Sequence, residues 1–486
     1  MKNKKGWNFD NTYKKLPQDF YSILDPMPVE KPEMILFNFR LADELGLDFS
    51  ETDQADLAAI FTGNQLPDGA EPISQAYAGH QFGHFTMLGD GRAIVLGEHL
   101  SPDGKRYDIQ FKGSGRTPYS RSGDGRATLY SMLREYLISE ALHHLGIPSS
   151  GSLAVAETGQ PVYRETVHPG AVLTRVASSH IRIGTFEYAS RFLSREKQQE
   201  FLDYTVARHY PDLEGSENRA LGLLKRVAEK QLNLALEWMR TGFIHGVLNT
   251  DNMSISGEAI DFGPCSFMNT FDPSTAFSSV DINKRYAFSN QPGIVQWNLA
   301  IFAGTLLPFI DDDEEKARTS AQEVIREFEP RFKDEWYRMM GKKLGFRKPG
   351  KQEKDLTDQL ISWMEKSKAD YTNTFLVIAN PDETPGHFKA DQEFRNWHDQ
   401  WIAAIEKQQG GLSEARRRMA QINPLFIPRN HLVEEALTEA SGHGDYAKFD
   451  TLLEKLKKPY RKQWEAKELQ LVPPGFDEQY KTFCGT

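Results

Sequence analysis

Two short motifs in the middle of the chain constrain its fold more than any other feature. The first runs from His245-Gly246-Val247 to Asn252, and the second is Asp261-Phe262-Gly263. Ser256-Gly257 lies between them and predicts a turn, so the motifs stand at the two ends of a short hairpin. An amide oxygen and a carboxylate placed in this way are suited to bind one hard cation. The pattern therefore predicts a metal site formed by Asn252 and Asp261.

Protein kinases carry the related motifs H-R-D-x-x-x-x-N and D-F-G. This chain keeps the spacing from His245 to Asn252, but Val247 stands where kinases have their catalytic Asp. Valine cannot accept a proton, so an ordinary kinase mechanism is not expected. Asp251 is the nearest carboxylate that could replace the missing base. The alternative is that Asp251 only orders the loop, and we favour the catalytic role.

Upstream of these motifs the chain has a lysine and a glutamate in the order that kinases use. Lys112 follows a predicted strand at 107–111, and Glu135 lies in a predicted helix at 127–145. In kinases the strand lysine is oriented by the helix glutamate and contacts phosphate. Most single Lys–Glu pairs are solvated surface charges. Only the position of this pair before the two motifs favours a functional role for it.

Glycine-rich loops flank Lys112 on both sides, at 88–93 and 113–126. Glycine lets backbone amides approach phosphate oxygens, and the helix that follows the second loop adds a favourable partial charge. Each loop alone is typical of a plain turn, and Asp124 could instead cap the helix at 127. Together with nearby guanidinium groups they predict a site for a polyanionic nucleotide. The guanidinium groups concerned are those of Arg164, Arg175 and Arg182.

The order of apolar patterns predicts an α+β protein with two lobes and a site in the cleft between them. Residues 1–185 are expected to form a β-rich lobe with one key helix, and residues 186–486 a mainly helical lobe. The strands are expected at 93–96, 107–111, 152–156, 161–164 and 171–176. The helices are expected at 127–145, 217–239, 294–307, 313–328 and 432–437.

Composition excludes several classes of protein. The net charge of −10 argues against a general binder of nucleic acid or anionic membranes. The apolar stretch at 299–310 is too short to span a bilayer and predicts a core helix. No signal peptide is recognised at the N-terminus. The two cysteines, Cys265 and Cys484, exclude a disulfide scaffold and favour a reducing cytoplasm. His80 and His180 lack a second ligand at metal spacing and are expected to be structural.

Several longer strings are far more specific than the kinase-like motifs, and they resemble the selenoprotein O family over essentially the whole chain. Members of that family are pseudokinase-like protein adenylyltransferases. The strings are Phe9-Asp10-Asn11 with Leu16-Pro17, residues 77–83 (YAGHQFG), 88–93 (LGDGRA), 110–115 (QFKGSG), 174–182 (TRVASSHIR), the His245 loop, Asn423-Pro424 with 427–431 (IPRNH), and the tail 483–486 (FCGT).

The resemblance implies a protein-kinase-like fold and a nucleotide bound in reverse, so that its α-phosphate meets the acceptor hydroxyl. Asn252 and Asp261 would hold Mg²⁺ (Mn²⁺ being the alternative), Asp251 would accept the proton, and Glu135 would orient Lys112. AMP would pass from ATP, or UMP from UTP, to Ser, Thr or Tyr hydroxyls of proteins. The nucleotide-binding residues implied in this way are Gly89, Gly91, Arg92, Lys112, Asp124, Gly125, Arg175, Arg182 and Asp261.

Three alternatives remain open from the sequence. A small-molecule phosphotransferase would need Asp where Val247 stands, and an inactive kinase-like scaffold would not need the retained lysine, glycine loops and metal ligands. The third concerns the tail, where some relatives carry selenocysteine and this chain has Cys484. Cys265 and Cys484 are expected either to stay unpaired thiols or to form a regulatory disulfide across the cleft.

Overall fold

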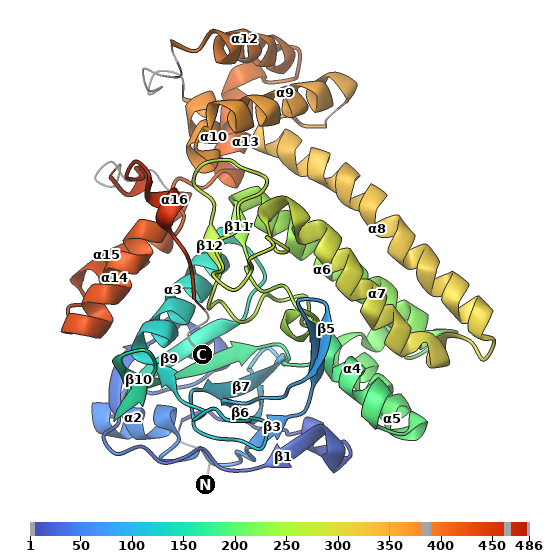
Figure 1. Ribbon diagram of the computed structural model, residues 1–486, viewed down its shortest axis with the longest axis vertical. Coiled ribbons are helices and arrows are strands. Elements are labelled where there is room, and N and C mark those ends of the chain that lie inside the picture. The colour runs from blue at the N-terminus through green and yellow to red at the C-terminus, as the bar shows by residue number, and fades with distance from the viewer. Residues whose placement is uncertain (1–4, 349, 381–387, 389, 461–467, 484–486) are drawn as a thin grey trace.

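The computed structural model describes residues 5–348, 350–380, 388, 390–460 and 468–483. The first part of the chain forms an antiparallel sheet in the order β1-β3-β6-β7-β10-β9-β2, and β8 pairs with β10 outside this path. A separate hairpin of β4 and β5 stands beside the sheet (Figure 1). The strands are β1 (Tyr21–Ile23), β2 (Glu33–Phe37), β3 (Ile73–Gln75), β4 (Ala78–Gln81), β5 (His84–Met87), β6 (Ala93–Leu100), β7 (Arg106–Lys112), β8 (Ala127–Thr128), β9 (Gly151–Tyr163) and β10 (Val167–Ala177).

The strands predicted around Lys112 are confirmed as β6 and β7. They are antiparallel neighbours, and Ala93 pairs with Lys112, so the first glycine loop ends beside this lysine. The strands predicted at 152–156 and 161–164 are instead one continuous strand, β9. Pro161 lies opposite Pro169, where β10 shifts its register, and such an irregularity lets a strand pass through a proline.

Both faces of the sheet are covered by helices. On one face, α1 (Phe39–Leu45) and α2 (Gln54–Thr62) share a core with Val172 of β10. On the other face, α3 (Leu129–Leu145) packs against Leu173, the next residue of β10, because neighbouring side chains of a strand point to opposite faces. Helix α3 confirms the predicted helix, begins at the N-cap Thr128 and ends at Gly146 in a left-handed conformation. The sheet thereby holds Glu135 in a fixed position.

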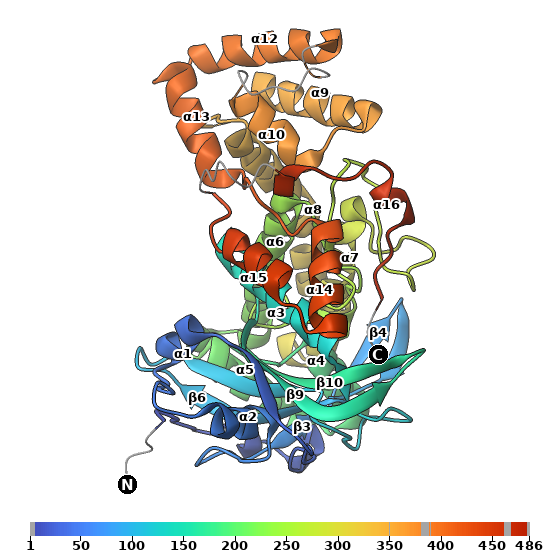
Figure 2. The ribbon, with the colours of Figure 1, turned by 90° about the vertical axis from the view of Figure 1, so that its left-hand side faces the viewer.

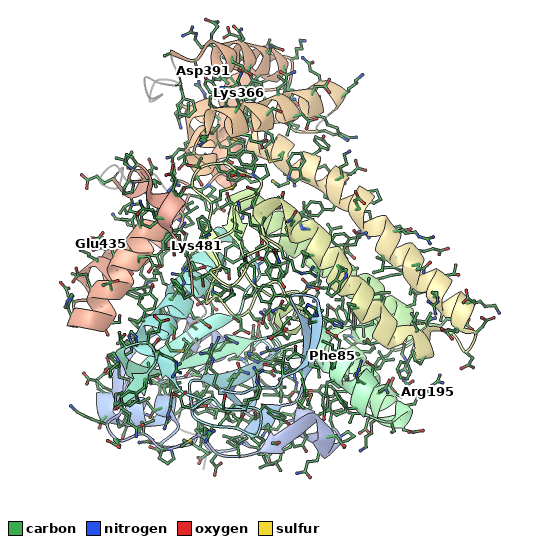
Figure 3. The ribbon with its side chains drawn as sticks, in the orientation of Figure 1. Phe85, Arg195, Lys366, Asp391, Glu435 and Lys481 are labelled. Atoms are coloured by element: carbon green, nitrogen blue, oxygen red, sulfur yellow. The ribbon has the colours of Figure 1, made fainter. Side chains whose placement is uncertain are left out.

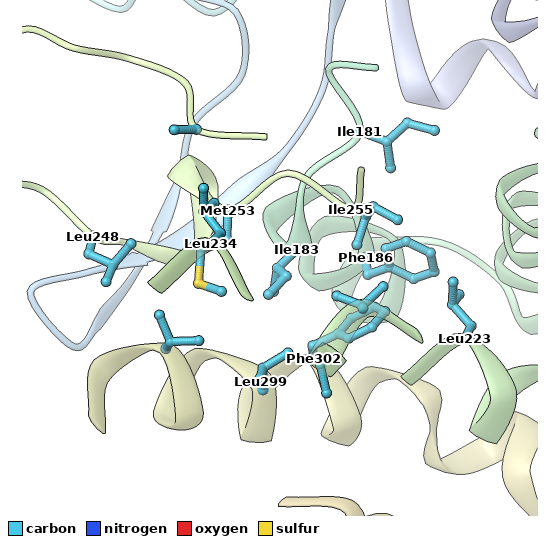
Figure 4. Close-up of a cluster of buried hydrophobic side chains, with 14 of the residues drawn as sticks. Ile181, Ile183, Phe186, Leu223, Leu234, Leu248, Met253, Ile255, Leu299 and Phe302 are labelled. Carbon is cyan, nitrogen blue, oxygen red and sulfur yellow. The ribbon is translucent and has the colours of Figure 1, made fainter. Parts of the chain in front are cut away.

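The second part of the chain is mainly helical. A large apolar core joins α4, α6 and α7, and Ile183, Leu223, Leu234, Leu299 and Phe302 lie in it (Figure 4). Two short strands, β11 (Phe243–Ile244) and β12 (Ser266–Phe267), pair around the segment that carries both central motifs. The helices are α4 (Ile183–Phe192), α5 (Arg195–His209), α6 (Arg219–Thr241), α7 (Gln291–Ile310), α8 (Glu314–Lys343), α9 (Lys351–Ser367), α10 (Tyr371–Ala379), α12 (Gln392–Glu406), α13 (Gly411–Ile422), α14 (Asn430–His443), α15 (Ala447–Leu456) and α16 (Phe476–Gln479).

Helix α8 is longer than the predicted segment 313–328. Its N-cap is Asp313, whose carboxylate accepts hydrogen bonds from the amides of Glu315 and Lys316. It then continues through Pro330 to Lys343, although a proline inside a helix removes one backbone hydrogen bond. Met340 beyond the proline is buried in a second apolar cluster, so tertiary packing outweighs local propensity here.

Among the described residues, one helical stretch is long and apolar enough to meet the criteria for a membrane span. It is Phe288–Ile310; the most apolar 18-residue window in it has a mean hydropathy of 1.5, and 44% of that window is buried. Core helices meet the same criteria. Val295, Leu299 and Phe302 lie in the large core beside α6, which agrees with the predicted core helix.

The helices after residue 350 pack in two different parts of the molecule. Helices α9, α10, α12 and α13 form the upper extension seen in Figures 1 and 2, around the aromatic cluster of Trp363, Trp397 and Trp401. Helices α14 and α15 instead return to α3, where Val433 and Leu437 pack against its apolar face. The predicted helix at 432–437 is therefore confirmed, is longer than expected, and supports the helix that carries Glu135.

Candidate active site

A cleft of about 500 Å³ lies between the sheet and the helical part. It brings together segments that are more than a hundred residues apart in the chain. Every residue that the sequence placed at the nucleotide, metal or proton-transfer site lines this cleft: Gly89, Gly91, Arg92, Lys112, Asp124, Gly125, Glu135, Arg175, Arg182, Asp251, Asn252 and Asp261.

A buried network of charges forms the centre of the cleft. Lys112 Nζ donates to Glu135 Oε1 and to Asp261 Oδ1, the latter at 2.5 Å. Arg175 Nη2 donates to Glu135 Oε2 and Asp261 Oδ1, both at 2.7 Å. Burial alone would raise the pKa of Asp261, but the charges of Arg175, Lys112 and Arg182 hold this pKa well below its usual range. Asp261 is therefore an anion in the resting protein.

Asp261 also has an uncommon backbone conformation, with φ at 64°. A residue other than glycine rarely adopts the left-handed region, and such residues concentrate at functional sites. His245 supports this segment from the other motif, because its Nε2 lies 2.9 Å from the carbonyl oxygen of Ile260. The predicted hairpin between the motifs is reduced to a bridge between Met253 and Ala259, with Gly257 in the turn.

The first glycine loop packs tightly against the second. A Cβ atom at Gly89 would lie 2.4 Å from Cγ of Tyr119, and one at Gly91 would lie 3.0 Å from the carbonyl oxygen of Tyr119. These two positions therefore require glycine for close approach. Between them, the carboxylate of Asp90 is buried and lies 3.7 Å from Arg182.

The second loop is held by an ion pair, and the alternative of Asp124 as a helix cap is wrong. Asp124 Oδ2 accepts from Arg164 Nη1 at 2.8 Å, and this contact lowers the pKa of Asp124. Thr128 is the actual N-cap of α3, because its hydroxyl accepts from the Ser131 amide. Asp124 is thus positioned at the cleft, with its side chain about half exposed at 46%.

Asp251 lies in a 3-10 turn, Thr250–Asn252, and its carboxylate is buried. Burial raises the pKa of Asp251 to about 6, although the charge of Arg182 acts in the opposite direction. No described residue hydrogen-bonds its Oδ1. Val247 lines the same cleft and offers no proton acceptor. Asp251 itself lines the cleft, and a carboxylate with a raised pKa at such a place is suited to accept a proton.

Asn252 and Asp261 provide the kind of oxygen ligands that a divalent cation requires. Asn252 Nδ2 donates to the carbonyl oxygen of Val247 at 2.8 Å, which leaves its Oδ1 to serve as a ligand. Asp261 is ionised and partly exposed to the cleft. One carboxylate and one amide oxygen suit a hard cation that takes its other ligands from phosphates and water. No cluster of three or more His, Cys, Asp or Glu residues suited to a metal was found in the described part of the chain.

Sequence reasoning missed the residues that fix the catalytic loop from the β4–β5 hairpin. The His80 amide donates to Thr250 Oγ1 at 2.7 Å, and the His80 ring pairs with Glu187, so His80 is structural as predicted. Gly79 stands directly against Asp251, since a Cβ atom there would lie 2.6 Å from Asp251 Oδ1. Residues 77–83 indicate only the resemblance to the family, because no rule of sequence spacing relates them to Asp251.

Two further residues of the site also escaped prediction. Tyr77 lies under Arg182, with the guanidinium carbon 4.3 Å from the ring centroid. Arg134, the neighbour of Glu135 in α3, donates to the carbonyl oxygens of Gly263 at 2.9 Å and Cys265 at 2.7 Å. Helix α3 is thereby tied to the Asp-Phe-Gly segment as well as to Lys112.

Of the two cysteines, only Cys265 lies within the described residues, and Cys484 is outside them. Cys265 is fully buried, its Sγ donates to the carbonyl oxygen of Phe262, and burial raises its pKa to about 12. A thiol in this state reacts slowly. The tail nevertheless comes close, because Thr482 Oγ1 donates to the carbonyl oxygen of Pro264 at 2.7 Å.

The comparisons with known proteins agree with this site. The family model described as Protein adenylyltransferase SelO matches residues 4–457. The chain is 51% identical to the protein nucleotidyltransferase YdiU of Nitrosococcus oceani over 483 residues, covering 99% of this chain and 98% of that protein. It is equally similar to the YdiU proteins of Brevibacillus brevis, at 99% and 98% coverage, and of Bacillus cereus, at 100% and 99%.

One solved structure shows a remote likeness. It is ROP2 from Toxoplasma gondii, described as a virulence factor with a protein-kinase fold and no enzymatic activity. The sequences are 9% identical, the match covers 71% of this chain and 85% of that one, and the TM-score is 0.25, which is too low to support an argument.

Proposed function

The chain belongs to the SelO family of protein adenylyltransferases and is a protein nucleotidyltransferase, and from this premise we propose that its cleft transfers AMP from ATP to Ser, Thr or Tyr hydroxyl groups of proteins. The observation that carries the proposal is that Val247 and Asp251 line the same cleft. The usual position of a kinase base holds a valine, whereas the buried Asp251 has a raised pKa and lines the same cleft.

The cations of the cleft bind the phosphates in this proposal. Lys112, Arg175 and Arg182 already converge on the carboxylate of Asp261, so the phosphates would meet three cationic side chains at one place. Guanidinium groups suit phosphate because they donate two parallel hydrogen bonds. Glu135 orients Lys112, and the backbone amides of the glycine loops contact the remaining phosphate oxygens. The loop residues assigned to ATP are Gly89, Gly91, Arg92, Asp124 and Gly125.

Asn252 and Asp261 hold the divalent cation, with Mg²⁺ as the proposed ion and Mn²⁺ as the substitute. When bound, the cation neutralises phosphate charge and so favours attack by an oxygen nucleophile. Asp261 keeps its negative charge for this role because three cationic side chains surround it.

Asp251 takes the proton of the acceptor hydroxyl. The hydroxyl oxygen forms a bond to the α-phosphorus of ATP, the bond from this phosphorus to the bridging oxygen breaks, and pyrophosphate leaves. The raised pKa of Asp251 suits this role, since a base with a pKa nearer the working pH binds the proton more strongly than an ordinary aspartate. UTP could serve in place of ATP through the same phosphate contacts.

We assign residues 1–185 to a lobe that binds the nucleotide phosphates and residues 186–486 to a lobe that carries the catalytic loop, the metal ligands and the helical extension. The strands of the large sheet lie between Tyr21 and Ala177, which supports this division. A reducing cytoplasm is the compartment we propose, because two cysteines in 486 residues provide no disulfide scaffold.

Labelled nucleotides test the reaction. The protein is incubated with a cell extract and Mg²⁺ and with ATP labelled at either the α- or the γ-phosphate. Label from the α-position should enter protein and label from the γ-position should not. Transfer of the γ-label would indicate a phosphotransferase, and no transfer of either label would indicate a scaffold. Mass spectrometry of modified peptides should show an AMP increment on a hydroxyl side chain.

A further inference from the structure

The loop 278–286, beyond the Asp-Phe-Gly segment, exposes two aliphatic side chains. Val280 is 52% exposed and Ile282 is 89% exposed. A single exposed apolar residue needs no explanation. These two differ because they flank Asp281, which is buried, so residues 280–282 turn a charged side chain inward and two apolar side chains outward.

The loop is held in one conformation by the buried aspartate. The carboxylate of Asp281 accepts hydrogen bonds from the amides of Arg285 and Tyr286, both at 2.8 Å. Lys284 adopts a left-handed conformation with φ at 51°, which closes the turn. A surface fixed in this way loses little conformational entropy when it binds a partner. Val280 and Ile282 are therefore presented on a preorganised loop.

The C-terminal tail adds an aromatic side chain beside this loop. The amide of Ser279 donates to the carbonyl oxygen of Thr482, and the amide of Thr482 donates to that of Phe277, both at 2.9 Å. Phe483, the next residue of the tail, is 71% exposed. We call Val280, Ile282 and Phe483 the acceptor patch. It joins two segments that are about two hundred residues apart in the sequence.

The acceptor patch is connected to the active-site cleft through the tail. Thr482, the neighbour of Phe483, is bonded to the carbonyl oxygen of Pro264, and Pro264 lines the cleft. At the other end of the loop, the hydroxyl of Tyr286 donates to Asn249 Oδ1, two residues before Asp251. A protein segment on this patch would therefore approach the cleft from the side of Pro264.

Two lysines lie in the segments that form the patch. Lys284 and Lys481 are both exposed, the latter labelled in Figure 3, although the whole chain carries a net charge of −10. An apolar surface with lysines at its border complements a segment that combines apolar and acidic side chains. Nucleic acid would complement the lysines but not the exposed Val280 and Ile282.

From these observations we infer that the acceptor patch binds an extended segment of the acceptor protein that has apolar side chains and acidic side chains next to the modified hydroxyl. The inference rests on the proposed function, because it names the class of acceptor for that reaction. Aromatic side chains are enriched in the cores of protein interfaces, and the rim of an interface is polar; Phe483 supplies the aromatic group here.

A peptide library with a fixed central Ser, Thr or Tyr and random flanks tests the inference. Wild-type protein should modify peptides enriched in Ile, Leu or Phe and in Asp or Glu near the acceptor. The double variant Val280→Asp, Ile282→Asp should modify them with kcat/KM lower by about tenfold or more and without this enrichment. ATP affinity, measured by calorimetry with Mg²⁺, should stay unchanged because neither residue lines the cleft.

Phe39→Asp is the matched control, since Phe39 is 67% exposed on α1, on the opposite side of the view in Figure 2 from the C-terminal end. It should behave as wild type. The swap Val280→Ile, Ile282→Val should retain both efficiency and enrichment, which separates apolar contact from loop folding. Wild-type efficiency of the double Asp variant would overturn the inference. So would a change of the protein from dimer to monomer in that variant, since the patch would then be a contact between copies. If wild-type protein modifies neither peptides nor extract proteins, the proposed function itself fails, and the inference fails with it.

Discussion

The sharpest test of the active site is the substitution Gly79→Ala. Gly79 belongs to β4, and a Cβ atom built on it would lie 2.6 Å from Oδ1, 2.9 Å from Cβ and 3.1 Å from Cγ of Asp251. Its φ is not in the left-handed region, so alanine fits the backbone and the effect comes from contact alone. Ordinary contact begins near 3.4 Å, so one of the two groups must retreat by about 0.8 Å.

The hairpin has little freedom to retreat, so most of the displacement should fall on Asp251. The His80 amide is bonded to Thr250 on one side. On the other side, Ala78 packs so closely on α4 that a Cβ atom at Gly184 would lie 2.0 Å from the Ala78 oxygen. A misplacement of about 1 Å in a catalytic group costs roughly a hundredfold in rate, or about 2.7 kcal/mol in the activation barrier.

We therefore expect Gly79→Ala to lower kcat for transfer of α-labelled AMP by about a hundredfold. ATP affinity in the presence of Mg²⁺ should change little, because Gly79 does not line the cleft. Gly304→Ala in α7 is the control, since a Cβ atom there meets nothing within 4 Å. Full activity of Gly79→Ala would refute the placement of Asp251 against β4. An equal loss of ATP affinity would show that the hairpin moved and disturbed the nucleotide site instead.

Three other perturbations test separate parts of the account. Asp261→Ala should abolish both metal-dependent ATP binding and activity. Asp251→Ala should keep ATP binding, measured by calorimetry, and lose at least about a hundredfold in rate. A similar loss of ATP affinity in both variants would contradict the assignment of Asp261 as metal ligand and Asp251 as base. Burial alone would raise the pKa of Asp108, but the charges of Arg208 and His180 hold this pKa below its usual range. The ionised carboxylate therefore stabilises the folded protein at pH values above about 4, the pKa of an aspartate in the unfolded chain. This stabilisation is lost as the pH falls below that value and the carboxylate becomes protonated. The difference in unfolding free energy between wild type and Asp108→Asn should therefore shrink from pH 7 towards pH 3, and a constant difference would contradict the pairing. If Cys265 and Cys484 form a regulatory disulfide, mild oxidation should give a linked peptide and a reversible loss of activity that Cys484→Ser lacks; free thiols and unchanged activity would exclude it.

The site residues that line the cleft could be predicted from the sequence because each motif places its functional residues at a fixed, short spacing along the chain. His245 to Asn252, Asp261 and the loop glycines each fix a short stretch of backbone, and all of the residues chosen from them line one cavity. The order of strands and helices around Lys112 and Glu135 then follows from apolar periodicity. Local pattern and tertiary structure agree at these positions.

The residues that sequence reasoning missed act through contacts between distant segments. Gly79 meets Asp251, Tyr77 meets Arg182, and Arg134 meets Gly263. No periodicity or spacing rule relates such pairs, since each depends on how the β4–β5 hairpin and α3 pack against the helical part. The same reason explains α8, which runs through Pro330 because residues beyond it are buried against α9 and α13.

The charge balance of the cleft explains why such a site needs a divalent cation to bind a nucleotide. Lys112, Arg175 and Arg182 are three cations, and they face three carboxylates, those of Glu135, Asp261 and Asp90. Asp261 is held ionised by its neighbours, whereas burial raises the pKa of Asp90. The centre of the site is thus close to neutral before the nucleotide arrives, and a triphosphate adds several negative charges. Cations on the protein alone do not balance them, because each is already paired in the interior, where an unpaired charge is costly. Asn252 and Asp261 would hold a divalent cation here, and its charge would offset that of the phosphates, so that Lys112 and Arg175 would be able to contact the substrate.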